Sequence, residues 1–236
     1  MFKIIKNFFD VLFNFNFYTK DYETNSNFNE TYAERLKLDP LFFVSEKFKN
    51  IKFTENQKLI VDSFINKNKV LINTYNYSHI TQIQKLLIIW FLKYNPNIKI
   101  LVLFPNDNLL KDFIFEIKIL LKTLDIDFYP QYTTNSINLN KITLSTFNNS
   151  KLFLKTTKHK LTSIVSEPEF DVIFMNQCLR SKNIVDVFNC LIRESNPVYF
   201  FITEIKQDRQ HTNLLDTLNV HNFTHISIPD DTTFEI

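Results

Sequence analysis

Strand-length apolar runs alternate with longer stretches of helical periodicity from about Ile51 onward. A run of five or six mainly apolar residues is typical of a strand buried on both faces, as in a parallel sheet. Such runs occur at residues 69–73, 99–104, 170–175, 198–202 and 224–228. Apolar residues recur at helical spacing at residues 54–65, 80–94, 109–124 and 183–193. This order predicts an α/β fold with a mostly parallel central sheet covered on both faces.

The pattern also predicts a hairpin and the edge of the sheet at which a ligand would bind. Residues 142–146 and 151–155 flank Asn148 and Asn149, a turn signal between two strand-like segments, so we expect them to pair antiparallel. In parallel α/β sheets, ligands bind beyond the carboxyl ends of the strands. The loops of interest therefore follow Asn73, Phe104, Met175 and Thr203.

Residues 1–45 are predicted to be an extension that precedes a single domain over residues 46–236. Residues 2–17 carry apolar side chains at helical spacing and predict an amphipathic helix that docks on a partner or on its own domain. The polar residues 19–31 favour a linker. Asp10 and Asn14 interrupt the first apolar run, which argues against a signal peptide, and no segment is apolar enough to span a membrane. We expect an intracellular (cytoplasmic) or virion protein that is not secreted.

Composition narrows the chemistry further. The chain contains no glycine, which is the residue that best allows backbone to approach a phosphate closely, and its only alanine is Ala33. A strongly AT-rich genome would account for this usage. The net charge of +2 neither requires nor excludes a nucleic-acid partner. Cys178 and Cys190 form no CxxC pair, so we expect both to be reduced core residues.

The order of these segments resembles the ATPase domain of the large terminase, the DNA-packaging motor of tailed phages. Residues 53–62 look like the segment before the first strand of that family, and residues 70–97 resemble its strand, phosphate loop and following helix. Residues 99–106 resemble the next strand and its end. The Asn148-Asn149-Ser150 turn is similar to its Asn-Gly-Ser hairpin, and residues 170–178 and 199–203 stand where the family carries its Walker B strand and coupling motif. The resemblance implies a three-layer RecA-like P-loop ATPase fold.

Helicases of the second superfamily share this layout and are the second choice. Residues 142–147, and Ile202-Thr203-Glu204 followed by Asp208-Arg209, are also similar to helicase motifs. A helicase requires a second RecA-like domain and a terminase requires a nuclease domain. We expect neither, because the sequence ends soon after its last predicted strand.

The resemblance places the ATP-binding motifs on residues that lack their chemistry. The Gly-Lys-Thr end of the phosphate loop corresponds to His79-Ile80-Thr81, so the lysine that reaches the phosphates is replaced by isoleucine. The acidic pair of the Walker B strand corresponds to Asn176 and Gln177, which are neutral amides. Asp171 lies at the opposite end of the strand.

Other clusters have ordinary explanations. His211, His221 and His225 are separated by ten and four residues without interleaved ligands, so we interpret them as surface residues rather than metal ligands. Lys151, Lys155, Lys158 and Lys160, with His159 between them, form the only basic cluster, and they fit either a solvated hairpin rim or a nucleic-acid backbone.

The sequence therefore predicts no catalytic, cofactor-binding or metal-binding residues and no cofactor. The leading interpretation is a degenerate, non-catalytic ATPase domain that serves as a structural or binding part of a larger viral or phage assembly, with protein partners bound through the N-terminal helix. A nucleic-acid-binding module without ATP hydrolysis is the alternative. A third possibility is a nucleotide-dependent enzyme that uses unusual ligands.

Overall fold

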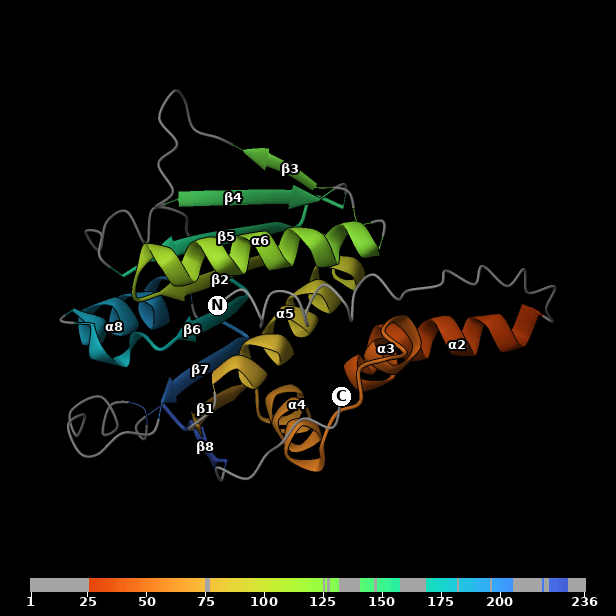
Figure 1. Cartoon of the computed structure of the whole chain (residues 1–236), viewed down its shortest axis with the longest axis horizontal. Helices are drawn as coiled ribbons and strands as arrows, with labels where there is room; N and C mark the ends of the chain where they lie inside the picture. Colours follow the sequence, from red (N-terminus) through yellow and green to blue (C-terminus); the bar gives the residue numbers. More distant parts are fainter. Residues whose placement is uncertain are drawn as a thin grey trace. The chain divides into compact units, whose positions relative to one another are not determined.

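The computed structural model describes residues 26–74, 77–124, 126, 128–131, 141–146, 148–157, 169–181, 183–195, 197–205, 218 and 221–228. The predicted helix over residues 2–17 lies outside these ranges. The chain divides into two compact units, with a boundary between Lys52 and Phe53. The units are described separately below (Figure 1).

The first unit contains the helices α2 (Ser26–Leu38) and α3 (Pro40–Lys47). Asp39 caps α3, because its Oδ1 atom accepts a 2.9 Å hydrogen bond from the Phe42 amide. The two helices pack through Tyr32, whose hydroxyl donates a 2.7 Å hydrogen bond to Glu46 and whose ring lies 5.5 Å from that of Phe42. Residues 26–31 were predicted to be linker, and this prediction is wrong. The tertiary contacts of α2 with α3 favour a helix that the polar composition did not signal.

The second unit is built on an eight-stranded sheet in the order β3-β4-β5-β2-β6-β7-β1-β8. The strands are β1 (Lys69–Thr74), β2 (Lys99–Phe104), β3 (Phe128–Gln131), β4 (Lys141–Thr146), β5 (Lys151–Thr156), β6 (Val172–Asn176), β7 (Tyr199–Ile205) and β8 (Thr224–Ser227). Five neighbouring pairs, β5-β2, β2-β6, β6-β7, β7-β1 and β1-β8, are parallel. The pairs β3-β4 and β4-β5 are antiparallel, which confirms the predicted hairpin.

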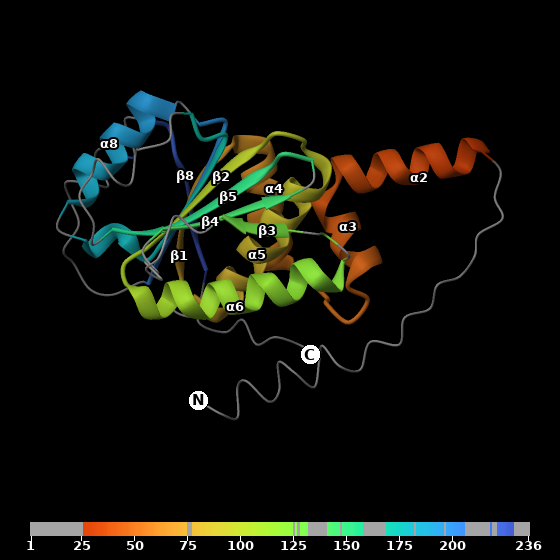
Figure 2. The ribbon, with the colours of Figure 1, turned by 90° about the horizontal axis from the view of Figure 1, so that it is seen from above.

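Helices cover both faces of this sheet and give the predicted three-layer α/β fold (Figure 2). They are α4 (Glu55–Lys67), α5 (Tyr77–Tyr94), α6 (Asp107–Thr123), the 3₁₀ helix η1 (Cys178–Arg180) and α8 (Ile184–Ser195). Helix α8 covers one face, and α6 runs along the opposite face, where it packs on β2 and β5. None of the helices in the described ranges is both long and apolar enough to cross a membrane.

Phenylalanine rings fill the core on both faces of the sheet. On the side of α4 and α5, the Phe64 ring lies 5.0 Å from Phe201 and 5.7 Å from Phe174. On the side of α8, the Phe188 ring lies 5.4 Å from Phe200. Such tilted and edge-on aromatic pairs add to the free energy gained by burying apolar area. These buried phenylalanines therefore serve packing.

Asparagine takes the place of glycine at most left-handed turns. Of the six residues with positive φ in the described segments, four are asparagines: Asn68, Asn97, Asn149 and Asn222. Asparagine tolerates this region better than other side chains, because its short amide bonds to nearby backbone. The remaining two are Glu169 and Gln177.

Candidate functional site

The connection from β1 to α5 is the one that the sequence resemblance assigns to the phosphate loop. Strand β1 ends at Thr74 and α5 begins at Tyr77, so only two residues, 75 and 76, separate them. The sequence predicted a helix over residues 80–94, and this start is three residues too late because α5 begins at Tyr77 and includes His79 in its first turn. A phosphate loop wraps its phosphate with successive backbone amides, including the free amides at the start of the following helix.

The residues that the resemblance assigns to the end of the phosphate loop are buried or partly buried. Ile80, at the position of the lysine, is 2% exposed. Partial burial lowers the pKa of His79 below its ordinary value, which favours the neutral imidazole. Thr81 follows in α5 and is half-buried. This turn of α5 thus places a buried isoleucine and a partly buried histidine at the positions that the resemblance assigns to the end of the phosphate loop.

The two positions that the resemblance assigns to the Walker B acids lie at the end of β6 and in the turn after it. Asn176 is completely buried, and its Oδ1 accepts a 3.4 Å hydrogen bond from the hydroxyl of Thr203 on β7. Its Nδ2 has no hydrogen-bond partner among the described residues. Gln177 adopts a left-handed backbone conformation with φ of 52°. Its backbone N–H donates a 2.9 Å hydrogen bond to the Thr203 carbonyl. Neither side chain carries the negative charge with which a carboxylate holds Mg²⁺.

Glu204 is an acid at this edge that the sequence analysis did not single out as a site residue. It lies on β7 directly after Thr203 and is 7% exposed, and its Oε2 accepts a 3.2 Å hydrogen bond from the Leu179 amide of η1. Successive strand residues face opposite sides of a sheet, so Glu204 faces away from Thr203 and Asn176. Burial, followed by the charge of Glu204, raises the pKa of the Cys178 thiol. The sequence feature that could have identified Glu204 is an acidic residue in a mainly apolar strand.

Asp171 lies at the amino end of β6, as its sequence position predicted. Its Oδ2 accepts a 2.8 Å hydrogen bond from the Lys99 amide, and its backbone bonds to both neighbouring strands. The carboxylate therefore supports strand alignment at the edge opposite the candidate site.

Two polar residues are buried within α5 beyond the candidate site. Gln84 is completely buried, and neither its Oε1 nor its Nε2 has a hydrogen-bond partner in the described part of the chain. Lys85 is 4% exposed and forms an ion pair with Glu116 of α6. Desolvation lowers the pKa of Lys85 to about 7, and the charge of Asp112 opposes this shift. The Glu116 side chain is 31% exposed, so solvent screens part of its attraction for the ammonium group.

The turn between β4 and β5 holds the carboxyl-terminal end of α5. Asn148 Nδ2 donates to the Leu92 carbonyl at 2.7 Å, and Ser150 Oγ donates to the Asn95 carbonyl at 2.8 Å. Asn149 supplies the left-handed residue of the turn, with φ of 63°. These bonds satisfy carbonyls that a helix end leaves without intrahelical donors. The turn that resembled a terminase motif therefore caps α5 at the amino edge of the sheet.

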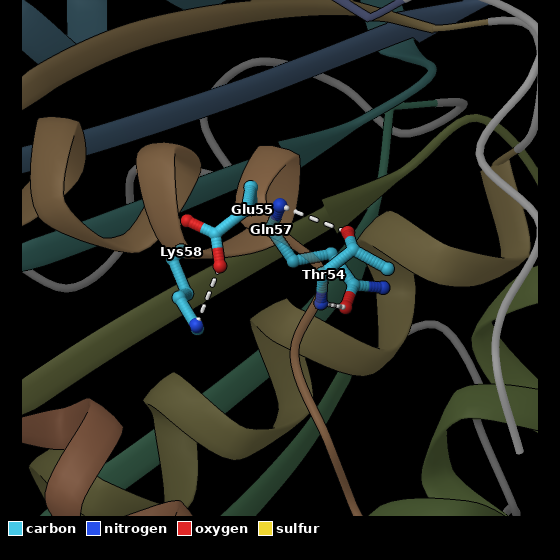
Figure 3. Close-up of polar contacts among 4 residues, drawn as sticks. All are labelled: Thr54, Glu55, Gln57 and Lys58. Carbon is cyan, nitrogen blue, oxygen red and sulfur yellow. Dashed lines mark hydrogen bonds and ion pairs between the residues drawn. The ribbon is translucent and has the colours of Figure 1, made fainter.

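The segment that precedes the first strand forms a capping box at α4 (Figure 3). Thr54 accepts from the Gln57 amide at 3.3 Å, and the Gln57 side chain accepts from the Thr54 amide at 2.9 Å. Lys58 pairs with Glu55 at 2.7 Å on the exposed side. Thr54 is therefore the N-cap of this helix, and the reciprocal bonds satisfy two of the free amides at its start.

The predicted basic cluster is not a continuous exposed surface. Lys155 is 2% exposed, and its ammonium lies 5.9 Å from the Phe153 ring centre and 5.8 Å from that of Phe170. Its placement on a solvated rim was therefore wrong, because its long stem packs in the aromatic core. Lys151 is half-buried, and Lys158 and Lys160 lie outside the described residues.

The histidines and cysteines that the sequence offered as candidate ligands do not form a metal site in the described part of the chain. Within the described ranges, no three His, Cys, Asp or Glu side chains gather closely enough to hold a metal ion. The His221 ring lies 5.6 Å from Phe188, His225 is exposed on β8, and His211 lies outside the described residues. Cys178 is buried as expected, whereas Cys190 is only half-buried.

The fold is shared with a large terminase, a DEAD box protein and a helicase. The large terminase of a thermophilic bacteriophage matches 79% of this chain and 48% of its own, with a TM-score of 0.56 at 10% identity. A DEAD box protein of Methanococcus jannaschii matches 81% of this chain and 54% of its own, with a TM-score of 0.52 at 13% identity. The UvsW helicase of bacteriophage T4 matches 96% and 77% respectively, with a TM-score of 0.50 at 13% identity.

These similarities confirm the expected RecA-like ATPase fold and its likeness to both terminases and helicases. The chain spans about half the length of the thermophilic phage terminase. Another structure of that terminase is a complex with ADP. No protein-family model matches the sequence, and no curated protein matches it either.

Proposed function

We propose that this chain is a non-catalytic domain with the fold of terminase and helicase ATPases, retained as a structural or binding component of a larger assembly. The burial of Ile80 at the lysine position carries the proposal, because this position in an active site must present a cation to the phosphates. An uncharged side chain that is 2% exposed is part of the core.

The connection between β1 and α5 supports the same conclusion independently. Two residues without glycine provide little free backbone to surround a phosphate.

The acidic side of the site is also altered. A Walker B carboxylate holds Mg²⁺, and an adjacent acid commonly activates water. Asn176 is instead buried against Thr203, and Gln177 is a neutral residue in the turn after β6. Glu204 bonds to Leu179, on the other side of β7. The charges for metal binding and for proton removal are therefore both missing from these positions.

A steady-state ATPase assay tests the loss of catalysis. The full chain should show no turnover above a boiled sample, with or without single- and double-stranded DNA or RNA. The thermophilic phage terminase is the positive control, because its fold is similar and it has been observed with ADP. Mg²⁺-dependent turnover that disappears in an Asn176→Ala variant would refute the proposal.

The binding role rests on the apolar stripe predicted for residues 2–17. A stripe that contains Phe2, Ile5, Phe9 and Phe13 is too apolar to leave in water, and we propose that it docks on a protein of the assembly, such as a phage or viral particle or a DNA-handling complex. Deletion of residues 1–18 should leave a folded, soluble chain that no longer joins its assembly in the native source. Unfolding or aggregation of the truncated chain would contradict a docking role.

A further inference from the structure

The two edges of the central sheet differ in how they are protected against pairing with another strand. The edge strands are β3 and β8, and each is four residues long (Figure 1). Strand β3 contains Pro130, which has no backbone N–H and is a common way to block an edge. Strand β8 has the sequence Thr-His-Ile-Ser, without proline, lysine, arginine or an acidic residue. The edge at β8 therefore carries none of the residues that usually prevent strand pairing.

Every second residue of β8 directs its backbone groups away from the sheet. The Ile228 amide, just after the strand, donates a 2.9 Å hydrogen bond to the Asn73 carbonyl of β1. Because backbone groups alternate in direction along a strand, Ile226 also bonds to β1, whereas His225 and Ser227 turn their N–H and C=O groups outward. In the described part of the chain β8 pairs with β1 alone, and the side chains of His225 and Ser227 are exposed. The outer side of β8 can thus accept another strand.

We propose that β8 pairs antiparallel with β8 of a second copy of this chain across a two-fold axis, so that two sheets join into one. With Ile226 on the axis, His225 of one copy lies opposite Ser227 of the other. These are the residues whose backbone groups turn outward, so each such pair exchanges both of its hydrogen bonds. This inference names one partner for the binding role proposed above and rests on that role, but it does not involve the candidate nucleotide site.

The side chains of β8 match those of a second copy in this register. Ile226 lies on the α4 side of the sheet, 9% exposed, and would lie opposite Ile226 of the other copy. His225 aligns with Leu71, which belongs to the core on the α8 side, and on that side it would lie beside Ser227 of the other copy. No lysine, arginine or carboxylate meets its like across the axis, whereas like charges directly opposite each other would destabilise such a pair. The edge is therefore complementary to itself.

Other occupants of this edge fit less well. A strongly charged peptide finds no opposite charge on β8, and a nucleic acid finds no basic cluster there. An uncharged strand of another protein would form the same backbone bonds, but a second copy brings a matching edge by symmetry. Because the paired edge is short, we expect a dissociation constant on the order of 100 µM. The high local concentration inside an assembly would offset this weak affinity.

Sedimentation velocity of the full chain tests the proposal. The chain should change from monomer to dimer between about 10 and 500 µM. Ser227→Pro removes an outward N–H and blocks the approach of a strand, so this variant should stay monomeric over the same range. It should keep the circular dichroism spectrum of the original chain, because that N–H is not directed at β1. His225→Lys should weaken dimerisation by about tenfold, because a lysine on the edge opposes strand pairing, and it provides the test if the proline variant does not fold.

The control is Lys111→Ser, since Lys111 is exposed on α6, which packs on β2 and β5 rather than on β8. This variant should dimerise like the original chain. The proposal is wrong if the chain is monomeric at all these concentrations, or if the β8 variants dimerise like the original. It is also wrong if dimerisation disappears on deletion of residues 1–18 but persists in the β8 variants, because the N-terminal segment would then form the contact. ATP turnover would overturn the proposed loss of catalysis without affecting this result.

Discussion

The two ends of helix α5 differ in how their polar groups are satisfied. At its carboxyl-terminal end, Asn148 and Ser150 donate hydrogen bonds to the carbonyls of Leu92 and Asn95. At its amino-terminal end, Ile80 is buried, and the nearby strand β6 ends in Asn176, whose Nδ2 has no partner in the described part of the chain. The first region contains bonds that fix a helix on a sheet. The second contains a buried isoleucine and a buried neutral amide.

The comparison distinguishes residues that the fold requires from residues that only ATP binding requires. A helix end requires donors for its last carbonyls whether or not the protein binds ATP. A lysine in the phosphate loop and a Walker B acid matter only while phosphate and Mg²⁺ bind. On the proposed function, residues of the first kind persist, and residues of the second kind have been replaced by uncharged ones that pack.

Restoring the charges should have the largest effect. Ile80→Lys combined with Asn176→Asp and Gln177→Glu places an ammonium and a carboxylate at buried positions where no ion pair has been established. Each uncompensated buried charge costs roughly 3–5 kcal/mol, which approaches the total stability of many domains. Urea unfolding followed by circular dichroism should show a strongly destabilised or unfolded chain that does not hydrolyse ATP.

Ile80→Met is the matched control, because it changes shape without adding charge and should cost less than about 1.5 kcal/mol. If the triple variant were as stable as the original chain and hydrolysed ATP, the prediction would be wrong. The backbone around these positions would then still have the geometry of an ATP site.

Removing the cap at the other end of α5 should have an intermediate effect. Asn148→Ala deletes the donor to Leu92 and the acceptor for the Ser150 amide, so we expect a loss of about 2 kcal/mol in the free energy of unfolding. Asn149→Gly should be neutral or slightly stabilising, because glycine adopts the positive φ of this position without strain. Equal losses in the two variants would argue against a specific capping role for Asn148.

Replacing a buried amide should have the smallest effect, and in the opposite direction. Gln84→Met keeps the approximate volume and removes two polar atoms that have no partner among the described residues, so the chain should gain about 1 kcal/mol in stability. Thermal unfolding measures the change, with Gln57→Met as the control. Gln57 is also buried but completes the α4 capping box, so its replacement should destabilise. Destabilisation by Gln84→Met would mean that its amide has a role.

The central sheet could be predicted from the sequence because its strands are continuous apolar runs. The runs at residues 69–73, 99–104 and 170–175 correspond to β1, β2 and β6 within a few residues. The hairpin was accessible because Asn148 and Asn149 form a turn signal between two strand-like segments. Strand β3 was not predicted. It is a four-residue edge strand that contains Pro130, and its pairing with β4 supplies a stability that its sequence does not signal.

The candidate site could be predicted from the sequence only in part. The replacement of its charged residues could be read from Ile80, Asn176 and Gln177, because the resemblance assigned a chemical role to each position. The burial of Lys155 and the bond between Glu204 and Leu179 were not accessible, because both depend on tertiary neighbours. The ion pair between Lys85 and Glu116 joins residues 31 apart in sequence, and no local pattern indicates such a partner.

Direct nucleotide binding tests the central claim most directly. Isothermal titration of the full chain with ATP and excess Mg²⁺ should give no saturable heat up to about 1 mM ligand, because Ile80 and Asn176 offer no charge to the phosphates or to Mg²⁺. The thermophilic phage terminase, titrated in the same buffer, should bind. Saturable micromolar binding that Thr81→Ala abolishes would contradict the account, because it would show that the turn at the start of α5 still holds a nucleotide.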